Sequence, residues 1–356
     1  MGIEKIDKAF KIGKTIVDGG LKRYILPNDN FDLYGVYYDI YKNKFYRMDS
    51  SIADVISDGV KLLATYTSGG RIRFSTNSSK FEISVKYDSL CNMSHMALEG
   101  SSGFMLVEEN QDGSNGFYKM FAPSADQKDG FAYSIDLPSD KMRSYILWFP
   151  LYNEISELII SFDEKAKVEK GRSYRKEMPI LYYGSSITQG GCASRPDNSY
   201  PALISKWNNI DFINLGFSGW GLAEDSMVDY LATIKCSLFV CDYDHNAPDL
   251  NYLQKTHYRL YSRYREKNPN VPILFLTAPN DCFEKHGDRY KTIKQTYIKA
   301  KKLGDKNVHF IDGWSLLGKK DRMNCLVDGC HPTDLGFYRM ASKIYNKMVS
   351  IDKKFK

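Results

Sequence analysis

The stretch ILYYGSSITQG, residues 180–190, joins a short apolar run to a small polar turn. Such a run predicts a buried β-strand, and the Gly-Ser-Ser turn after it would expose a hydroxyl at the edge of a sheet. Similar apolar runs follow at residues 212–215, 238–240, 273–276 and 308–311. Helix-like segments come after these runs, near residues 200–207, 223–234, 250–266, 290–303 and 335–349. Five strand–helix units in succession predict a doubly wound parallel sheet of the flavodoxin-like kind.

The N-terminal half has a different pattern of apolar and polar residues. Short segments with period-two alternation are separated by Asn, Ser, Gly and Asp; they lie at residues 71–76, 81–86, 103–107, 144–149 and 157–162. This pattern predicts an antiparallel β-sandwich, which we describe as jelly-roll-like. The charged stretch 166–177 is a plausible linker. We therefore predict an α/β protein with two domains, a β-sandwich over residues 1–170 and a catalytic domain over residues 171–356.

Composition excludes several classes of protein. The net charge of +6 comes from 49 basic and 43 acidic residues without a long basic run, so no nucleic-acid partner is expected. The seven cysteines form no C-x-x-C pair and signal neither a zinc ribbon nor a disulfide framework. The N-terminal residues Met1–Lys5 begin a polar stretch, and no run of eighteen apolar residues occurs. These features predict a cytoplasmic protein with no membrane partner, and they leave its oligomeric state open.

Ser186 is the candidate nucleophile, because it lies in the turn after the first predicted strand of the parallel sheet. A serine hydroxyl needs an imidazole base that is held by a third group. His331 follows the last predicted strand, and Asp328 lies three residues before it. One short loop can therefore supply both partners of a Ser-His-Asp triad.

Two other strand ends offer donors for an oxyanion hole. Gly219 follows the second predicted strand and Asn246 follows the third. Glycine permits close backbone approach and an asparagine amide is a neutral donor, so we expect the hole to combine Asn246 with the Gly219 and Ser186 backbone amides. The alternatives are a packing role for Gly219 and a turn-capping role for Asn246 before Pro248. Three aromatic residues near these strand ends suit a substrate pocket or the core equally: Tyr183, Trp220 and Tyr243.

Other kinds of site are poorly supported. Asp242, Asp244 and Asn246 imitate the start of a calcium loop, but Ala247 stands where that loop needs glycine. Neither a Walker lysine nor a Gly-x-Ser-x-Gly elbow occurs. Three histidines lack a nearby carboxylate or ligand spacing in the sequence: His257, His286 and His309. We expect neither a cofactor nor a metal.

Taken in order, these blocks resemble those of the GDSL/SGNH hydrolases, over roughly residues 178 to 350. Gly184-Ser185-Ser186 stands at the family's Gly-Asp-Ser, with Ser185 in place of the aspartate. Gly219 and Asn246 stand at its oxyanion residues, although Asn246 lies in Asp-His-Asn-Ala rather than Gly-x-Asn-Asp. Asp328 with His331 stands at its Asp-x-x-His.

The N-terminal half resembles the accessory β-domain of some carbohydrate acetylesterases. The segment FPLYN, residues 149–153, is the clearest match, and NGFY, residues 115–118, stands for the usual Gly-x-Asp-Leu-Tyr. The resemblance implies a serine esterase that removes short acyl groups, in particular acetyl, from a small-molecule or oligosaccharide ester. The alternatives are a lipid or thioester acylhydrolase on the same scaffold and a non-catalytic carbohydrate-binding protein.

Overall fold

The computed structural model describes residues 15–110, 115–139, 141–175, 178–280 and 282–356. The start of the chain at Met1–Lys5 and the linker residues 176–177 therefore lie outside the described residues. By internal contacts the chain divides into two compact units. Unit 1 comprises residues 1–47, 65–173 and 195–197, and unit 2 comprises residues 48–64, 174–194 and 198–356. The domain boundaries at residues 170 and 171 stay a prediction.

Unit 1 consists of two antiparallel sheets. The first has the order β1-β2-β12-β7-β10 and the second the order β13-β6-β11-β8-β9, with β3 paired to β6. The strands of the first sheet are β1 (Thr15–Asp18), β2 (Leu21–Ile25), β7 (Lys80–Lys86), β10 (Gly130–Asp136) and β12 (Glu157–Asp163). Those of the second are β3 (Asp32–Tyr34), β6 (Arg71–Thr76), β8 (Phe104–Glu109), β9 (Asn115–Phe121), β11 (Arg143–Trp148) and β13 (Val168–Lys170). A hairpin of β4 (Tyr37–Asp39) and β5 (Lys44–Tyr46) and a short helix, α3 (Leu98–Ser101), complete the unit.

Aromatic side chains from both sheets fill the core of unit 1. Phe74 of β6 stacks on Phe81 of β7 with ring centroids 6.2 Å apart, and Phe162 of β12 meets both rings edge-on. All three are fully buried. Side chains from both sheets thus pack into one core, and the predicted antiparallel β-domain is confirmed.

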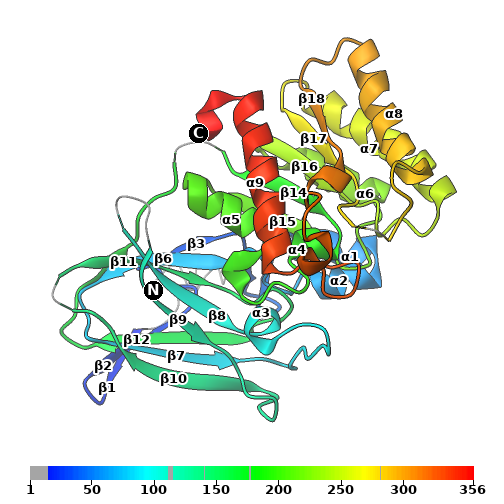
Figure 1. The fold of residues 1–356 in the computed structure, drawn as a ribbon. Helices are drawn as coiled ribbons and strands as arrows, with labels where there is room; N and C mark the ends of the chain where they lie inside the picture. The colour runs from blue at the N-terminus through cyan, green and yellow to red at the C-terminus, as the bar shows by residue number, and fades with distance from the viewer. Residues whose placement is uncertain (1–14, 111–114, 140, 176–177, 281) are drawn as a thin grey trace. The chain divides into compact units, whose positions relative to one another are not determined.

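Unit 2 is built on a parallel sheet with the order β15-β14-β16-β17-β18 (Figure 1). Its strands are β14 (Ile180–Gly184), β15 (Phe212–Gly216), β16 (Leu238–Asp242), β17 (Ile273–Leu276) and β18 (Val308–Ile311). They coincide with the five apolar runs to within two residues at each end. In chain order the arrangement is 2-1-3-4-5, the flavodoxin-like order, so the predicted fold class is confirmed.

The helices of unit 2 are α5 (Tyr200–Asn208), α6 (Asp225–Thr233), α7 (Leu250–Lys267), α8 (Asp288–Lys302) and α9 (Asp334–Ile351). Helix α5 packs against α9, whereas α6, α7 and α8 pack against one another in series. Right-handed crossovers in this strand order place the two groups on opposite faces of the sheet. The unit also contains short helices, which are α1 (Ser50–Ile56), α2 (Asp58–Leu63), α4 (Ser186–Gln189), η3 (Pro196–Asn198, in both units), η4 (Gly313–Ser315), η5 (Arg322–Cys325) and η6 (Lys353–Phe355).

One segment of the N-terminal half belongs to unit 2. Helices α1 and α2 pack on the α6 region, where the Asp49 N–H donates to the Tyr230 hydroxyl at 3.1 Å. A Cβ at Gly59 of α2 would lie 2.0 Å from the Trp220 ring, so only glycine lets this helix approach the indole.

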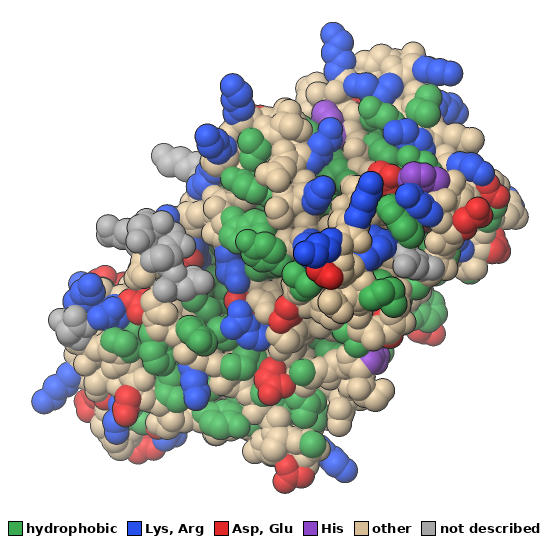
Figure 2. All heavy atoms as spheres, viewed as in Figure 1, with side chains coloured by type: hydrophobic (Ala, Val, Ile, Leu, Met, Phe, Trp, Pro, Cys, Tyr) green, Lys and Arg blue, Asp and Glu red, His purple; other side chains and the backbone are tan. Residues whose placement is uncertain are grey.

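The surface is mixed in charge. On the face drawn in Figure 2, Lys and Arg side chains are spread among acidic and uncharged ones. Among the described residues, no helix combines the length and apolar character needed to cross a membrane.

Candidate active site

The site residues of unit 2 follow strands that end side by side. In the sheet register, Gly184 of β14 pairs with Gly216 of β15 on one side and with Asp242 of β16 on the other. Ser186, Gly219 and Asn246 come two, three and four residues after these positions. Their loops therefore emerge from one edge of the sheet, where the carboxyl ends of the strands lie.

Ser186 is held at the start of α4. The N–H of Ser185 donates to the Asp242 carbonyl at 2.8 Å, and its hydroxyl caps α4 by accepting the Ile187 N–H at 3.2 Å. The serine that replaces the family's aspartate thus serves as an N-cap, a role for which both residue types are suited. Ser186 keeps 8% of its surface exposed, which leaves it accessible but fixed.

The predicted triad is assembled in one hydrogen-bonded chain. The Ser186 Oγ lies 2.8 Å from the His331 Nε2, and the His331 Nδ1 lies 2.7 Å from the Asp328 Oδ2. With the proton on Nδ1, the imidazole donates to the carboxylate and presents a lone pair to the hydroxyl. This arrangement can remove a proton from Ser186 as its oxygen attacks a carbonyl.

Asp328 also organises the loop that carries His331. Its Oδ1 accepts the backbone N–H groups of Cys330 at 2.9 Å and His331 at 2.7 Å. Partial burial raises the pKa of this carboxyl, but the hydrogen bonds from His331 and Cys330 outweigh burial and lower the pKa to about 2. Asp328 is therefore negatively charged at any pH near neutrality.

Gly219 presents an open backbone surface. It has φ +74°, a left-handed conformation that favours glycine, and no atom lies within 4 Å of the position of a Cβ. Within the described part of the chain, its N–H has no hydrogen-bond partner. The Gly219 amide is thus available to an oxygen of a ligand.

The Asn246 side chain lies against the β15 loop. Its Nδ2 donates to the Phe217 carbonyl at 2.7 Å, which uses one of the two amide hydrogens. A Cβ at Gly221 would lie 2.4 Å from the Gly184 carbonyl and 3.1 Å from the Asn246 Nδ2. Glycine at position 221 therefore lets the amide pack close to the end of β14, with one hydrogen left for another acceptor.

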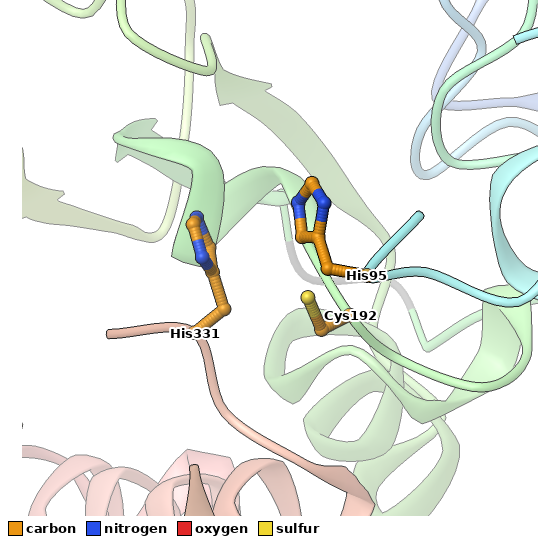
Figure 3. Close-up of side chains that lie close together, drawn as sticks. All are labelled: His95, Cys192 and His331. Atoms are coloured by element: carbon orange, nitrogen blue, oxygen red, sulfur yellow. The ribbon is translucent and has the colours of Figure 1, made fainter. Parts of the chain in front are cut away.

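Cys192 is a second potential nucleophile beside the base. Figure 3 shows its side chain together with that of His331, and the Sγ lies within 4.8 Å of a ring nitrogen. Burial, reinforced by the charge of Asp328, raises the pKa of the Cys192 thiol to about 12. A protonated thiol is a poor nucleophile, so the geometry favours Ser186.

Of the three aromatic residues near the strand ends, Tyr183 and Tyr243 belong to the core. The Tyr183 hydroxyl accepts the Ala223 N–H at 2.7 Å, and the Tyr243 hydroxyl lies 2.9 Å from the Thr256 Oγ1. Both tyrosines are buried, whereas Trp220 is 42% exposed. Of the three, only Trp220 keeps the accessibility that a pocket wall requires.

The histidine predictions need one correction. His286 does have a carboxylate partner, because its Nε2 lies 2.7 Å from the Asp312 Oδ2. This pair connects the loops after β17 and β18, which sequence spacing did not reveal. His257 is buried and His309 half-buried, and burial lowers the pKa of each to about 4.

The Asp242–Asn246 segment does not form the calcium loop that its letters imitate. Thr188 donates to the Asp242 carboxylate at 3.1 Å, the Ala278 N–H donates to Asp244 at 2.9 Å, and the Asn246 amide is turned to Phe217. Asp242 and Asp244 do have ligand atoms within 4.8 Å of a nitrogen of His245. Burial, with the neighbouring charge of Asp244, raises the pKa of Asp242 to about 7.

Solved structures resemble the chain over nearly its whole length. A protein described as a GDSL-like lipase, from Bacteroides ovatus, is 27% identical with a TM-score of 0.82, covering 94% of this chain and 98% of that one. A salicylyl-acyltransferase from a tetracycline biosynthetic pathway is 18% identical with a TM-score of 0.76, covering 94% and 98%. An acetyl xylan esterase from the rumen bacterium Butyrivibrio proteoclasticus is 14% identical with a TM-score of 0.61, covering 94% and 100%. The last two show likeness of fold alone.

Two family models match consecutive parts of the sequence, and no curated protein matches it. Residues 24–168 match the N-terminal domain of SGNH-hydrolase-type esterases, whose model is named for Gly-x-Asp-Leu-Tyr. Our placement of this motif at Asn115–Tyr118 stays a prediction. Residues 177–350 match the GDSL-like lipase/acylhydrolase family. The chain is therefore a member of the GDSL/SGNH hydrolase family with the accessory N-terminal β-domain found in esterases of this type.

Proposed function

We propose that this protein is a serine esterase that removes short acyl groups, in particular acetyl, from an acylated carbohydrate. The observation that carries the proposal is the hydrogen-bonded chain from Ser186 through His331 to Asp328. The choice of a carbohydrate ester is supported by the similarity to carbohydrate esterases of the same two-domain fold. Release of acetate from acetylated sugars, together with labelling by a fluorophosphonate, tests the activity directly.

The proposed reaction proceeds in two steps. Ser186 Oγ attacks the ester carbonyl as His331 Nε2 takes its proton, and His331 then protonates the leaving alcohol oxygen. The backbone amides of Ser186 and Gly219 and the free hydrogen of the Asn246 amide stabilise the oxyanion. Water, deprotonated by His331, then attacks the acyl-enzyme; the bond between the acyl carbon and the Ser186 Oγ breaks, the carboxylic acid leaves, and Ser186 takes the proton from His331. These side chains complete both steps without a cofactor or metal.

The acyl-chain preference separates this proposal from the lipid or thioester alternative. We expect activity towards 4-nitrophenyl acetate to exceed that towards the octanoate by a wide margin, because acetyl is the group proposed to be removed. The values of kcat/KM over a series of acyl chain lengths measure this preference. A maximum at eight carbons or more would instead support a lipid acylhydrolase.

A second outcome of the same assay concerns the acceptor of the acyl group. One of the similar structures is an acyltransferase, and an acyl-enzyme can pass its acyl group to an alcohol as well as to water. Product analysis with and without an added sugar alcohol distinguishes transfer to water from transfer to the alcohol. Predominant transfer to the alcohol at low acceptor concentration would make the protein an acyltransferase.

Asn246→Ala is expected to lower kcat by about a hundred- to a thousand-fold, or ~2.7–4 kcal/mol, because it removes one oxyanion donor. The KM should change little, since this donor acts mainly when charge develops on the oxygen. Steady-state kinetics of the purified variant measure both parameters.

The control for this variant is Asn251→Ala, which removes an exposed amide at the start of α7. Asp244 is unsuitable as a control, because it is buried and accepts the Ala278 N–H. If Asn246→Ala behaves like the control, or mainly loses thermal stability through its lost bond to Phe217, then Asn246 is a turn residue. The oxyanion hole would then consist of two backbone amides.

A further inference from the structure

The loop that carries the proposed base is tied together mainly from within. Asp328 accepts the N–H groups of Cys330 and His331, and the Val327 N–H donates to the His331 carbonyl at 2.9 Å. The Cys330 carbonyl instead receives a hydrogen bond from outside the loop. Its donor is the Asn280 Nδ2, at 2.7 Å. This bond attaches the loop to the segment after β17.

Asn280 is buried and its amide is fully used. It is 2% exposed, its Oδ1 accepts the Cys282 N–H at 3.2 Å, and its Nδ2 lies 2.8 Å from the His245 Nε2. A flipped amide would set its oxygen against the Cys330 carbonyl and its nitrogen against the Cys282 N–H. Two bonds of three would be lost, so the orientation is determined by its surroundings.

This orientation also assigns the tautomer of His245. Since the Asn280 Nδ2 is a donor, the neutral ring accepts at Nε2 and carries its proton on Nδ1. That nitrogen lies 3.3 Å from the Asp244 Oδ1, and Asp244 is in turn held by the Ala278 N–H. Asp244 and His245 therefore lie directly behind the Asn280 amide.

The contacts that run from Asp244 and His245 through Asn280 to Cys330 link three loops of the parallel sheet. Asp244 and His245 follow β16 and directly precede Asn246, Asn280 follows β17, and Cys330 adjoins His331 after β18. A displacement of the base by about 1 Å is enough to cost roughly a hundred-fold in rate. The bond from Asn280 to the Cys330 carbonyl is one of the contacts that hold the loop carrying His331, together with a contact of the Cys282 Sγ with the Gly329 carbonyl at 3.5 Å.

We propose that Asn280, oriented by His245, is a positioning residue that holds the Cys330 carbonyl and so sets His331 opposite the Ser186 hydroxyl. The inference rests on the proposed triad and adds to it a residue outside the four family motifs. Asn280 does not touch the reacting atoms; it acts through the backbone of the loop.

The test is Asn280→Asp, which keeps the shape and the acceptor for the Cys282 N–H but replaces the donor with an oxygen. We expect kcat per active serine to fall by about 10- to 100-fold, with KM little changed. Active sites are counted by labelling to completion with a fluorophosphonate, so that loss of folded protein does not lower the value. If the buried carboxylate prevents folding, Asn280→Ala removes the same donor without a charge and should show the same deficit.

The matched control is Asn208→Asp in α5. Asn208 is 5% exposed, and its Nδ2 donates to the Ile204 carbonyl at 2.8 Å, away from the loop. Its variant should lose thermal stability but keep its kcat per active serine. Wild-type kcat in both Asn280 variants would overturn the inference while the triad stands, provided that Ser186→Ala is inactive in the same assay. Activity in Ser186→Ala would instead overturn the proposed function.

Discussion

Ser186→Ala is expected to abolish ester hydrolysis, with kcat lowered by about a millionfold, while the protein remains folded. The change removes the atom that would carry the acyl group, and loss of a nucleophilic serine has an effect of this order in serine hydrolases. The side chain is small and fills no large volume of the core, so the thermal stability should change little. The measurement is the initial rate on 4-nitrophenyl acetate, combined with a melting curve.

Ser185→Ala provides the matched control, because it removes the neighbouring hydroxyl and leaves the nucleophile. Ser185 caps α4, so its loss should cost about 1 kcal/mol of stability and only a small part of the activity. Fluorophosphonate labelling should persist in Ser185→Ala and disappear in Ser186→Ala. Turnover of Ser186→Ala well above the uncatalysed rate would remove this serine from the mechanism.

The parallel sheet could be predicted closely because its strands are short, apolar and bounded by polar turns. The run at residues 273–276 coincides with β17, and the helix expected over residues 250–266 is one residue shorter than α7. The assignment of α1 and α2 to unit 2 could not be predicted. Its cause is a close contact between Gly59 and Trp220, residues that are far apart in the sequence.

Some residues of the candidate site could likewise be predicted from the sequence, and others could not. Ser186 could be found because it follows β14 closely, and Asp328 and His331 because they lie three residues apart just before α9. Their residue types fit one mechanism. Asn280 also follows a strand, in the segment Ala278-Pro279-Asn280, but a lone asparagine after a proline is usually a turn residue. Only the bond to Cys330, fifty positions away in the sequence, distinguishes it. The pairing of His286 with Asp312 was missed for the same reason.

Asp328→Asn is expected to lower kcat by about 10⁴-fold with the loop intact. The asparagine Oδ1 can still accept the N–H groups of Cys330 and His331, which keeps the backbone in place. Its Nδ2 would then face the His331 Nδ1, where the carboxylate now accepts a hydrogen bond from the ring. A donor at this position favours the tautomer with the proton on Nε2, and that ring cannot accept a proton from Ser186. Steady-state kinetics and a melting curve measure the two effects.

Asp334→Asn is the control for charge in the same region. The Asp334 carboxylate accepts the Ser194 N–H at 2.9 Å and lies at the first turn of α9, so its loss should reduce stability by a small amount and leave kcat close to wild type. The Asp328 carboxylate, with its pKa of about 2, is charged throughout the range of an esterase assay, so protonation of Asp328 should not lower the kcat of the wild-type protein down to pH 5. A kcat within ten-fold of wild type would mean that Asp328 only shapes the loop. His331 would then act as a base without a charged partner.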